Sequence, residues 1–297
     1  MKSYLKKVLF AWVVCAGLVP GSAAQEVHYY GVNSRPLEQP DGAVMRKELD
    51  YRNDRKLTIT TEQRAGDQWV RVSREKIRLA GQKEWVIRYR AEHLFSSKFY
   101  REYSETEPGH FIFREYSLTT DIRTGSTAGR FPLYLEGTVT EYYPNGQVRT
   151  IAEYIDNQLI SNKNWLEDGT RYIDSIFYSA DEEPEYEYGP DFFRNYLIQK
   201  LANSEWDLSQ IQDRVVIGWV IMESGELKGV RALEGKSKQL NDFLIRTISE
   251  MPGKWQPAIL NGKAVRYFMQ IPLNFDVRDI NFQELGISTG QLYYDKY

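Results

Sequence analysis

Few side chains in this sequence have the types and spacing that chemistry requires. The chain has three histidines, His28, His93 and His110, and one cysteine, Cys15. Histidines this far apart form no metal-ligand pattern, and a single cysteine excludes an intrachain disulfide and a cysteine-rich zinc site. His93 follows Glu92, but one histidine beside one glutamate does not make a general base. We therefore expect no metal site and no disulfide.

The usual catalytic motifs do not occur either. The sequence contains no glycine-rich phosphate loop, no G-x-S-x-G turn and no H-E-x-x-H segment. Paired carboxylates, which could act as general acid and base, occur only in one acidic run at 181–187, and a run without apolar periodicity is typical of a solvated surface. The sequence therefore predicts a protein that is not an enzyme, with no catalytic residue and no cofactor.

The composition indicates a β-rich globular protein. The chain has 297 residues, of which 42% are hydrophobic and 14% aromatic, and this aromatic content favours strands. A chain of this length and apolar content can bury a core, which excludes wholesale disorder. Its 38 Lys and Arg against 41 Asp and Glu give a net charge of −3. Without a positive field, nucleic acid is not an expected partner.

The first 24 residues have the pattern of a secretory signal peptide. Lys2, Lys6 and Lys7 precede an apolar run at 8–19, and small residues at 22–24 form a cleavage site. An uncleaved membrane anchor is the alternative, but a spanning helix needs about 20 apolar residues and this run is shorter. Cleavage at this site leaves an exported chain without cysteine. We therefore predict that the protein lies in the periplasm, associated with a membrane only if the leader is retained.

The region 25–108 has the alternation of β-strands. Apolar and polar side chains alternate at 56–61, 69–72 and 84–89, so each run buries one face. Turn-forming residues separate these runs. The sequence predicts an antiparallel β-meander here and does not indicate its role.

An internal repeat occupies 109–178. The segment Y-Y-P-N-G-Q-V at 142–148 reads as strand, turn and strand, and a related segment, N-W-L-E-D-G-T, follows at 164–170. The two turn glycines, Gly146 and Gly169, lie 23 positions apart. Asn-Gly favours a type I′ turn, in which both residues adopt positive φ. The pattern resembles the MORN-type repeats of the YwqK-like family, which implies stacked hairpins that bind or scaffold; an ordinary sheet with hairpin turns is the alternative.

A linker at 179–190 separates the repeats from the C-terminal region. It holds two prolines, and five acidic residues lie between 181 and 187. Such a segment is typical of an exposed boundary between domains. We therefore expect two independently folding units that join here.

The C-terminal region alternates between helical and extended patterns. Apolar residues recur at helical spacing in 191–201, where Asp191 is the expected N-cap, and again in 240–248. Strand-like segments lie at 214–222, 227–233 and 264–276. The order helix, two strands, helix, strand predicts a small sheet that buries one face against both helices.

These residues carry a resemblance to the C-terminal domain of TonB-type energy transducers. The segments that carry it are I-M-E-S-G-E-L at 221–227, M-P-G-K-W-Q-P at 251–257, N-G-K-x-V at 261–265 and I-P-L-x-F at 271–275. The resemblance covers about 190–277 and implies two helices on a three-stranded antiparallel sheet. The predicted fold class is therefore α+β: a β-meander and repeat region, then this domain at 191–277 and a tail at 278–297.

The chain departs from the family pattern in its first loop and in its arm. The sequence N-S-E-W at 203–206 stands where the family has a Tyr-Pro pair, which puts any partner contact of this loop in doubt. The family also has a proline-rich arm, which this chain replaces with the β-repeat region.

The resemblance implies a binding site on the last strand. Domains of this family accept an extended peptide from an outer-membrane transporter by strand addition, which needs only an exposed sheet edge. The expected partner-binding edge is Val265, Arg266, Tyr267, Phe268, Met269 and Gln270. Arg266 and Gln270 are expected to point outward, whereas Trp255, Val265, Phe268 and Phe275 are expected in the core.

Two functions are consistent with these patterns. The first is a non-enzymatic periplasmic TonB-like protein, linked to transmembrane transport, which binds a TonB-dependent outer-membrane receptor or another envelope protein. The second is a cell-envelope scaffold or adaptor that binds partners through the hairpin repeats without energy transduction.

Overall fold

The computed structural model describes residues 25–81, 83–90, 96–118, 120–204, 211–275 and 288–289. The predicted signal peptide at 1–24 lies outside the described residues, as do His93 and all of the tail at 278–297 except 288–289.

The predicted α+β class is wrong, because the described part of the chain is mostly β. Strands make up 59% of it and helices 12%. The main element is one antiparallel sheet of twelve strands that runs without a break across the predicted boundary at 108/109. The β-rich region and the repeats are therefore one structural unit.

The strands of the large sheet follow one another in space almost as they do in the sequence. Their order is β12 to β3, then β1 and β2. The bounds are β1 (Gln25–Tyr30), β2 (Pro36–Leu37), β3 (Met45–Asn53), β4 (Lys56–Ala65), β5 (Gln68–Ala80), β6 (Lys83–Arg90), β7 (Ser96–Glu107), β8 (His110–Ser117), β9 (Thr120–Thr127), β10 (Leu135–Tyr142), β11 (Val148–Ile155) and β12 (Gln158–Asn164). The strands expected at 56–61, 69–72 and 84–89 are confirmed as parts of β4, β5 and β6.

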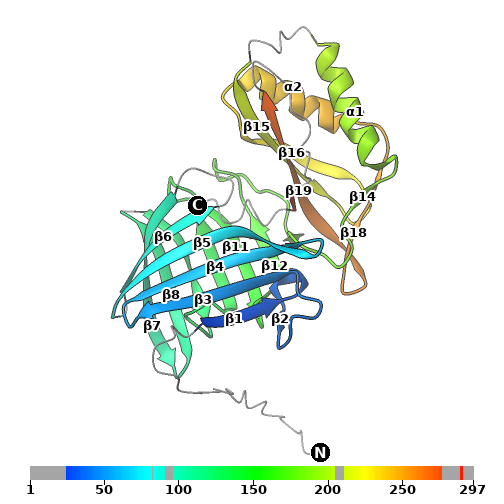
Figure 1. Ribbon diagram of the computed structural model, residues 1–297. Helices are drawn as coiled ribbons and strands as arrows, with labels where there is room; N and C mark the ends of the chain where they lie inside the picture. Colours follow the sequence, from blue (N-terminus) through cyan, green and yellow to red (C-terminus); the bar gives the residue numbers. More distant parts are fainter. Residues whose placement is uncertain are drawn as a thin grey trace, which may run out of the picture.

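The large sheet curves so strongly that its two ends, at β12 and β2, come close without pairing (Figure 1). A short 3-10 helix, η1 (Val32–Ser34), joins them. The Asn33 side-chain amide donates to the Leu159 carbonyl, and that of Asn157 donates to the Ser34 carbonyl. Phe131, which follows β9, packs against the buried cluster of β3 to β7. The inner face of the sheet is therefore covered in part.

Two equivalent turns confirm the spacing of the predicted hairpins but not their type. In the first turn, Gly146 N–H donates to the Tyr143 carbonyl, and in the second Gly169 N–H donates to the Leu166 carbonyl in the same way. Only the glycine of each turn has positive φ, at 85° and 83°, and Asn145 does not. The expected type I′ turn is therefore wrong: each is a tight turn closed by a glycine bulge. The Asn145 side chain donates to the Glu167 carbonyl and so joins one turn to the next.

The C-terminal region differs from the expected two helices on a three-stranded antiparallel sheet. Among the described residues, its sheet has six strands, in the order β13, β19, β15, β16, and β18 and β20 also pair with β19. The pairing of β13 with β19 is parallel. The bounds are β13 (Ile176–Phe177), β14 (Glu185–Tyr186), α1 (Gly189–Ala202), β15 (Asp213–Ile221), β16 (Leu227–Glu234), α2 (Lys238–Ser249), β17 (Trp255–Gln256), β18 (Ala258–Leu260), β19 (Lys263–Phe275) and β20 (Ser288–Thr289).

One apolar core unites α1, α2, β15 and β19. It includes Phe193 and Leu197 from α1, Leu244 from α2 and Trp219 from β15. The expected N-cap is wrong: Asp191 lies inside the first turn of α1, because the helix begins before Pro190, with Tyr188 as its N-cap.

The segment expected to be an exposed linker is instead packed against the C-terminal sheet. The strand β14 pairs with β17, and the Glu182 N–H and carbonyl exchange hydrogen bonds with Ile259. Tyr186 is buried, its ring centroid 5.1 Å from that of Trp255. The acidic residues are exposed, but the carboxylates of Asp181, Glu183 and Glu187 accept hydrogen bonds from the Asn261 N–H, the Tyr267 hydroxyl and the Lys254 N–H. Composition alone therefore misjudged this segment.

Candidate functional site

The six residues of the predicted partner-binding edge lie on β19, but they are not an open edge. Tyr267 to Gln270 pair with β15 on one side. On the other side β13 pairs with Arg266 and Tyr267, and β20 pairs with Met269 and Gln270. Val265 pairs with β18. The expectation of an exposed edge is therefore corrected.

Two side chains expected to point outward are held within the protein. Gln270 is only 7% exposed. The Arg266 guanidinium donates to both carboxylate oxygens of Glu223, at 3.0 and 3.1 Å, and to the Asp174 carbonyl. The expectation that Trp255, Phe268 and Phe275 belong to the core is confirmed, because all three are buried. Val265, expected with them, is only half-buried and packs against that core.

The outer side of β19 is covered only in part. The two strands that pair with it there, β13 and β20, have two residues each, whereas β19 has thirteen. Among the residues that the structure describes, 271–275 pair with β15 and have no second strand partner. Pro272 has no N–H, and a strand tolerates proline where the backbone groups of that residue point away from the neighbouring strand. The backbone of Pro272 is therefore expected to point away from β15. Positions two apart face the same way, so the backbone of Asn274 faces outward too.

A buried asparagine of the large sheet holds β13 in place. The Asn162 side chain of β12 donates to the Ile176 carbonyl at 2.6 Å and accepts from the Ile176 N–H at 3.0 Å. Asn164 donates to Asn162 and to the Ile173 carbonyl. The Asn162 side chain therefore bonds both backbone groups of Ile176, as a neighbouring strand would. Because Ile176 belongs to β13, these bonds connect the large sheet to the outer side of β19.

A second candidate site lies on the inner face of the large sheet, where charged side chains form a ladder. Directly paired residues on β6 to β10 alternate in charge: Glu84, Arg101, Glu115, Arg123 and Glu141. Arg101 contacts Glu115 at 2.6 Å and Glu84 at 3.6 Å, and Arg123 contacts Glu115 at 3.1 Å. We call these five residues the charge ladder.

The ladder alters the ionisation of two carboxyl groups, Glu115 and Glu84. Burial raises the pKa of Glu115, but the charges of Arg123 and Arg101 outweigh this effect and lower that pKa well below its ordinary value. Burial dominates at Glu84 and raises its pKa, against the opposing charges of Arg101 and Arg130. Glu115, in the middle of the ladder, is therefore firmly ionised, whereas Glu84, at one end, holds a proton more readily.

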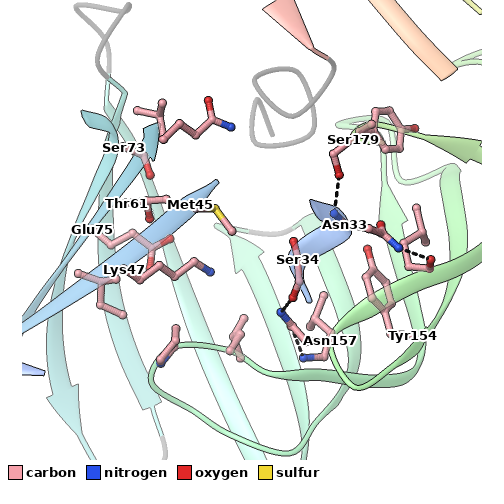
Figure 2. A pocket seen from close by; sticks show the side chains of 18 of the residues that line it. Asn33, Ser34, Met45, Lys47, Thr61, Ser73, Glu75, Tyr154, Asn157 and Ser179 are labelled. Carbon is pink, nitrogen blue, oxygen red and sulfur yellow. Dashed lines mark hydrogen bonds between the residues drawn. The ribbon is translucent and has the colours of Figure 1, made fainter. Parts of the chain in front are cut away.

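The ladder borders a hollow of about 230 Å³ inside the curved sheet. Arg101 and Arg123 line it, together with residues from both ends of the sheet. Figure 2 shows Met45 and Lys47 on one wall and Tyr154 and Asn157 on the opposite wall. The hollow is thus a product of the curvature.

Sequence reasoning missed both the charge ladder and the hydrogen bonds from Asn162 and Asn164 that hold β13. A signal was present: Arg101, Glu115 and Arg123 each occupy an inward position of an alternating strand, where an apolar residue is usual. Which charges meet depends on the register of successive hairpins, which the pattern of one strand does not give.

Comparison of the chain with models of known protein families, with curated proteins and with solved structures finds no match. Within the described ranges, no three His, Cys, Asp or Glu side chains are grouped so that they could hold a metal ion. Within the same ranges, no helix has the length and apolar character needed to cross a membrane.

Proposed function

We propose that the protein is a non-enzymatic periplasmic binding protein that takes up an extended segment of an envelope protein as an added strand on the outer side of β19. The resemblance of 190–277 to the C-terminal domain of TonB-type energy transducers supports this proposal and makes a TonB-dependent outer-membrane receptor the favoured partner, in a role linked to transmembrane transport.

One observation carries the proposal: a strand of thirteen residues is covered on its outer side by strands of only two residues. Each short strand contributes few main-chain hydrogen bonds, so a longer partner strand can replace it. Main-chain groups supply the binding, and the side chains of the partner need little sequence specificity. The partner gains additional contacts along 271–275.

Isothermal titration calorimetry with a short extended peptide of the TonB-box type tests this proposal. We expect Asn274→Pro to weaken binding roughly five- to tenfold, because it removes one outward N–H donor from the edge. Asn274 is exposed, so the matched control Asn274→Ala should bind as the unchanged protein does. Circular dichroism must first show that both variants are folded.

A variant that loosens β13 and leaves β19 unchanged gives a prediction of opposite sign. Asn162→Ala removes both hydrogen bonds to Ile176 and should raise peptide affinity, because β13 is then displaced more easily. If no such peptide binds either protein, strand addition on β19 is wrong and the scaffold function of the hairpin repeats remains.

A further inference from the structure

The outer face of the large sheet carries a cluster of cations on β4 to β7. One row of directly paired residues on these strands is buried in an apolar core: Leu57, Ile77, Val86 and Phe99. Successive side chains of a strand point to opposite faces, so the residues that alternate with this row point outward. The outward residues include Lys56, Arg74, Lys76, Arg78 and Lys98, which we call the basic cluster.

The cluster differs in charge from the chain as a whole. The outward positions of β4 to β7 that pair directly with its members hold Thr, Ile, Trp or Tyr and no acidic residue. In the whole chain, 41 Asp and Glu exceed 38 Lys and Arg. A small negative net charge therefore conceals a positive region on one side of the large sheet.

Ion pairs do not neutralise the basic cluster. The pairs on the same face lie beside it, where Arg46 contacts Glu62 at 2.6 Å and Lys83 contacts Glu102 at 3.1 Å. Within the described ranges, no member of the cluster forms an ion pair with a carboxylate, and the buried Nε of Arg74 has no hydrogen-bond partner. The positive charge of the cluster is therefore available to a partner.

The carboxylates of the neighbouring strand β3 are too distant to change this. Glu48 and Asp50 pair with Thr60 and Thr58 of β4, so they lie two strands away from β5. Two strand spacings amount to about 10 Å. This is more than the Debye length of about 8 Å at physiological ionic strength, so the two charges are largely screened from the cations of β5.

Aromatic side chains lie between the cations. Tyr89, which pairs with Arg74, is 39% exposed, and the Lys76 ammonium lies 5.1 Å from the centroid of its ring. Trp85 and Tyr100 are half-buried on the same face, with their ring centroids 4.6 Å apart. Tyr and Trp have an apolar body and a polar tip, which suits them to the boundary between a membrane and water. The face thus combines cations with side chains typical of a membrane surface.

We propose that the basic cluster binds the surface of a membrane that contains anionic phospholipid. Guanidinium and ammonium groups bind the lipid phosphates, and Trp85 and Tyr89 lie among the head groups. Each Lys or Arg near such a surface strengthens binding about fivefold. The predicted export to the periplasm favours a membrane over nucleic acid as the anionic partner. The site is separate from the strand addition proposed for β19, so either proposal can fail alone.

Co-sedimentation of the full chain with lipid vesicles tests the proposal. One set of vesicles is phosphatidylcholine alone, and the other contains phosphatidylcholine and phosphatidylglycerol at three to one. We expect the anionic vesicles to bind at least about tenfold more tightly, and high salt to remove the difference, because salt screens exposed charges. Equal binding to both vesicles, or tighter binding to duplex DNA at the same phosphate concentration, would overturn the proposal.

Two double variants with the same change in net charge locate the site. Lys56→Gln with Arg78→Gln removes two exposed, directly paired cations of the cluster and should weaken binding to the anionic vesicles about 25-fold. The control, Arg194→Gln with Lys236→Gln, removes two exposed cations of the C-terminal region and should change binding less than twofold. All the proteins carry the same residues 1–24, so the difference between the variants reports the cluster alone.

Equal losses in the two double variants would overturn the assignment. Circular dichroism must first show that both are folded. A single variant on another strand, Lys98→Gln, gives a second measurement if the first double variant does not fold. It should weaken binding about fivefold, and no loss in this variant would also contradict the proposal.

Discussion

At Glu115, the buried guanidinium of Arg101 and the half-buried guanidinium of Arg123 share one carboxylate. Arg101 and Arg123 contact it from the neighbouring strands β7 and β9, and all three lie on the inner face of the sheet. Removing one member of a buried ion group leaves the others charged and without compensation, which costs far more than losing a surface pair.

We therefore predict that Glu115→Gln lowers the free energy of unfolding at pH 7 by about 3–5 kcal/mol. The control Glu107→Gln changes an exposed residue beside the β7–β8 turn and should change stability by less than about 0.5 kcal/mol. Urea unfolding of the three proteins measures the difference. Similar losses in both variants would show that the ladder does not stabilise the fold.

The lowered pKa of Glu115 gives this prediction a pH dependence. Its pKa is lower in the folded protein than the ordinary value of 4.5, so the folded state binds the proton less readily than the unfolded chain. The stabilisation is present above that ordinary value and is lost as the pH falls toward the folded-state pKa. The gap between the unchanged protein and Glu115→Gln should therefore be smaller at pH 3 than at pH 7.

Among the elements, the β15–β16 hairpin depends on Gly225, which forms the turn and also contacts the backbone of Trp255. Gly225 closes this turn with φ 79°, and its carbonyl accepts from the Trp255 N–H. A Cβ at this position would collide with the Trp255 carbonyl. Gly146 closes the β10–β11 turn with φ 85° and has no atom within 4 Å of such a Cβ.

This pair separates backbone strain from steric collision. Gly146→Ala should cost about 1–2 kcal/mol, the penalty for an L-residue in the left-handed region. Gly225→Ala should cost at least about 3 kcal/mol, because the collision adds to the same strain. Urea unfolding of both variants measures these costs. Equal costs would mean that the collision of the added Cβ with the Trp255 carbonyl does not destabilise the fold.

For the whole molecule, the packing of 176–187 against the C-terminal sheet means that the predicted boundary at 190/191 does not divide the protein. A fragment that begins at 191 lacks β13 and β14 and uncovers Trp255. A fragment that begins at 171 retains both strands. We expect the longer fragment to melt cooperatively and the shorter one to melt more than about 4 °C lower, roughly 1 kcal/mol for a domain of about 100 residues. Equal melting temperatures would restore the linker interpretation.

The sequence alone determined most of the secondary structure. The alternation in β4, β5 and β6, the helical spacing in α1 and α2, and the fixed interval between Gly146 and Gly169 all depend on neighbouring residues. Local periodicity and turn glycines report such features directly, because they fix which side chains share a face.

The tertiary structure decided which segments meet. Whether Arg101 lies opposite Glu115, whether β13 covers β19, and whether the segment 181–187 packs or stays exposed depend on contacts between residues far apart in the chain. A one-residue change of register would exchange the two faces of a strand without altering its pattern. The charge ladder, the hollow and the covered edge therefore follow from pairing and curvature, since many weak long-range interactions together select one register.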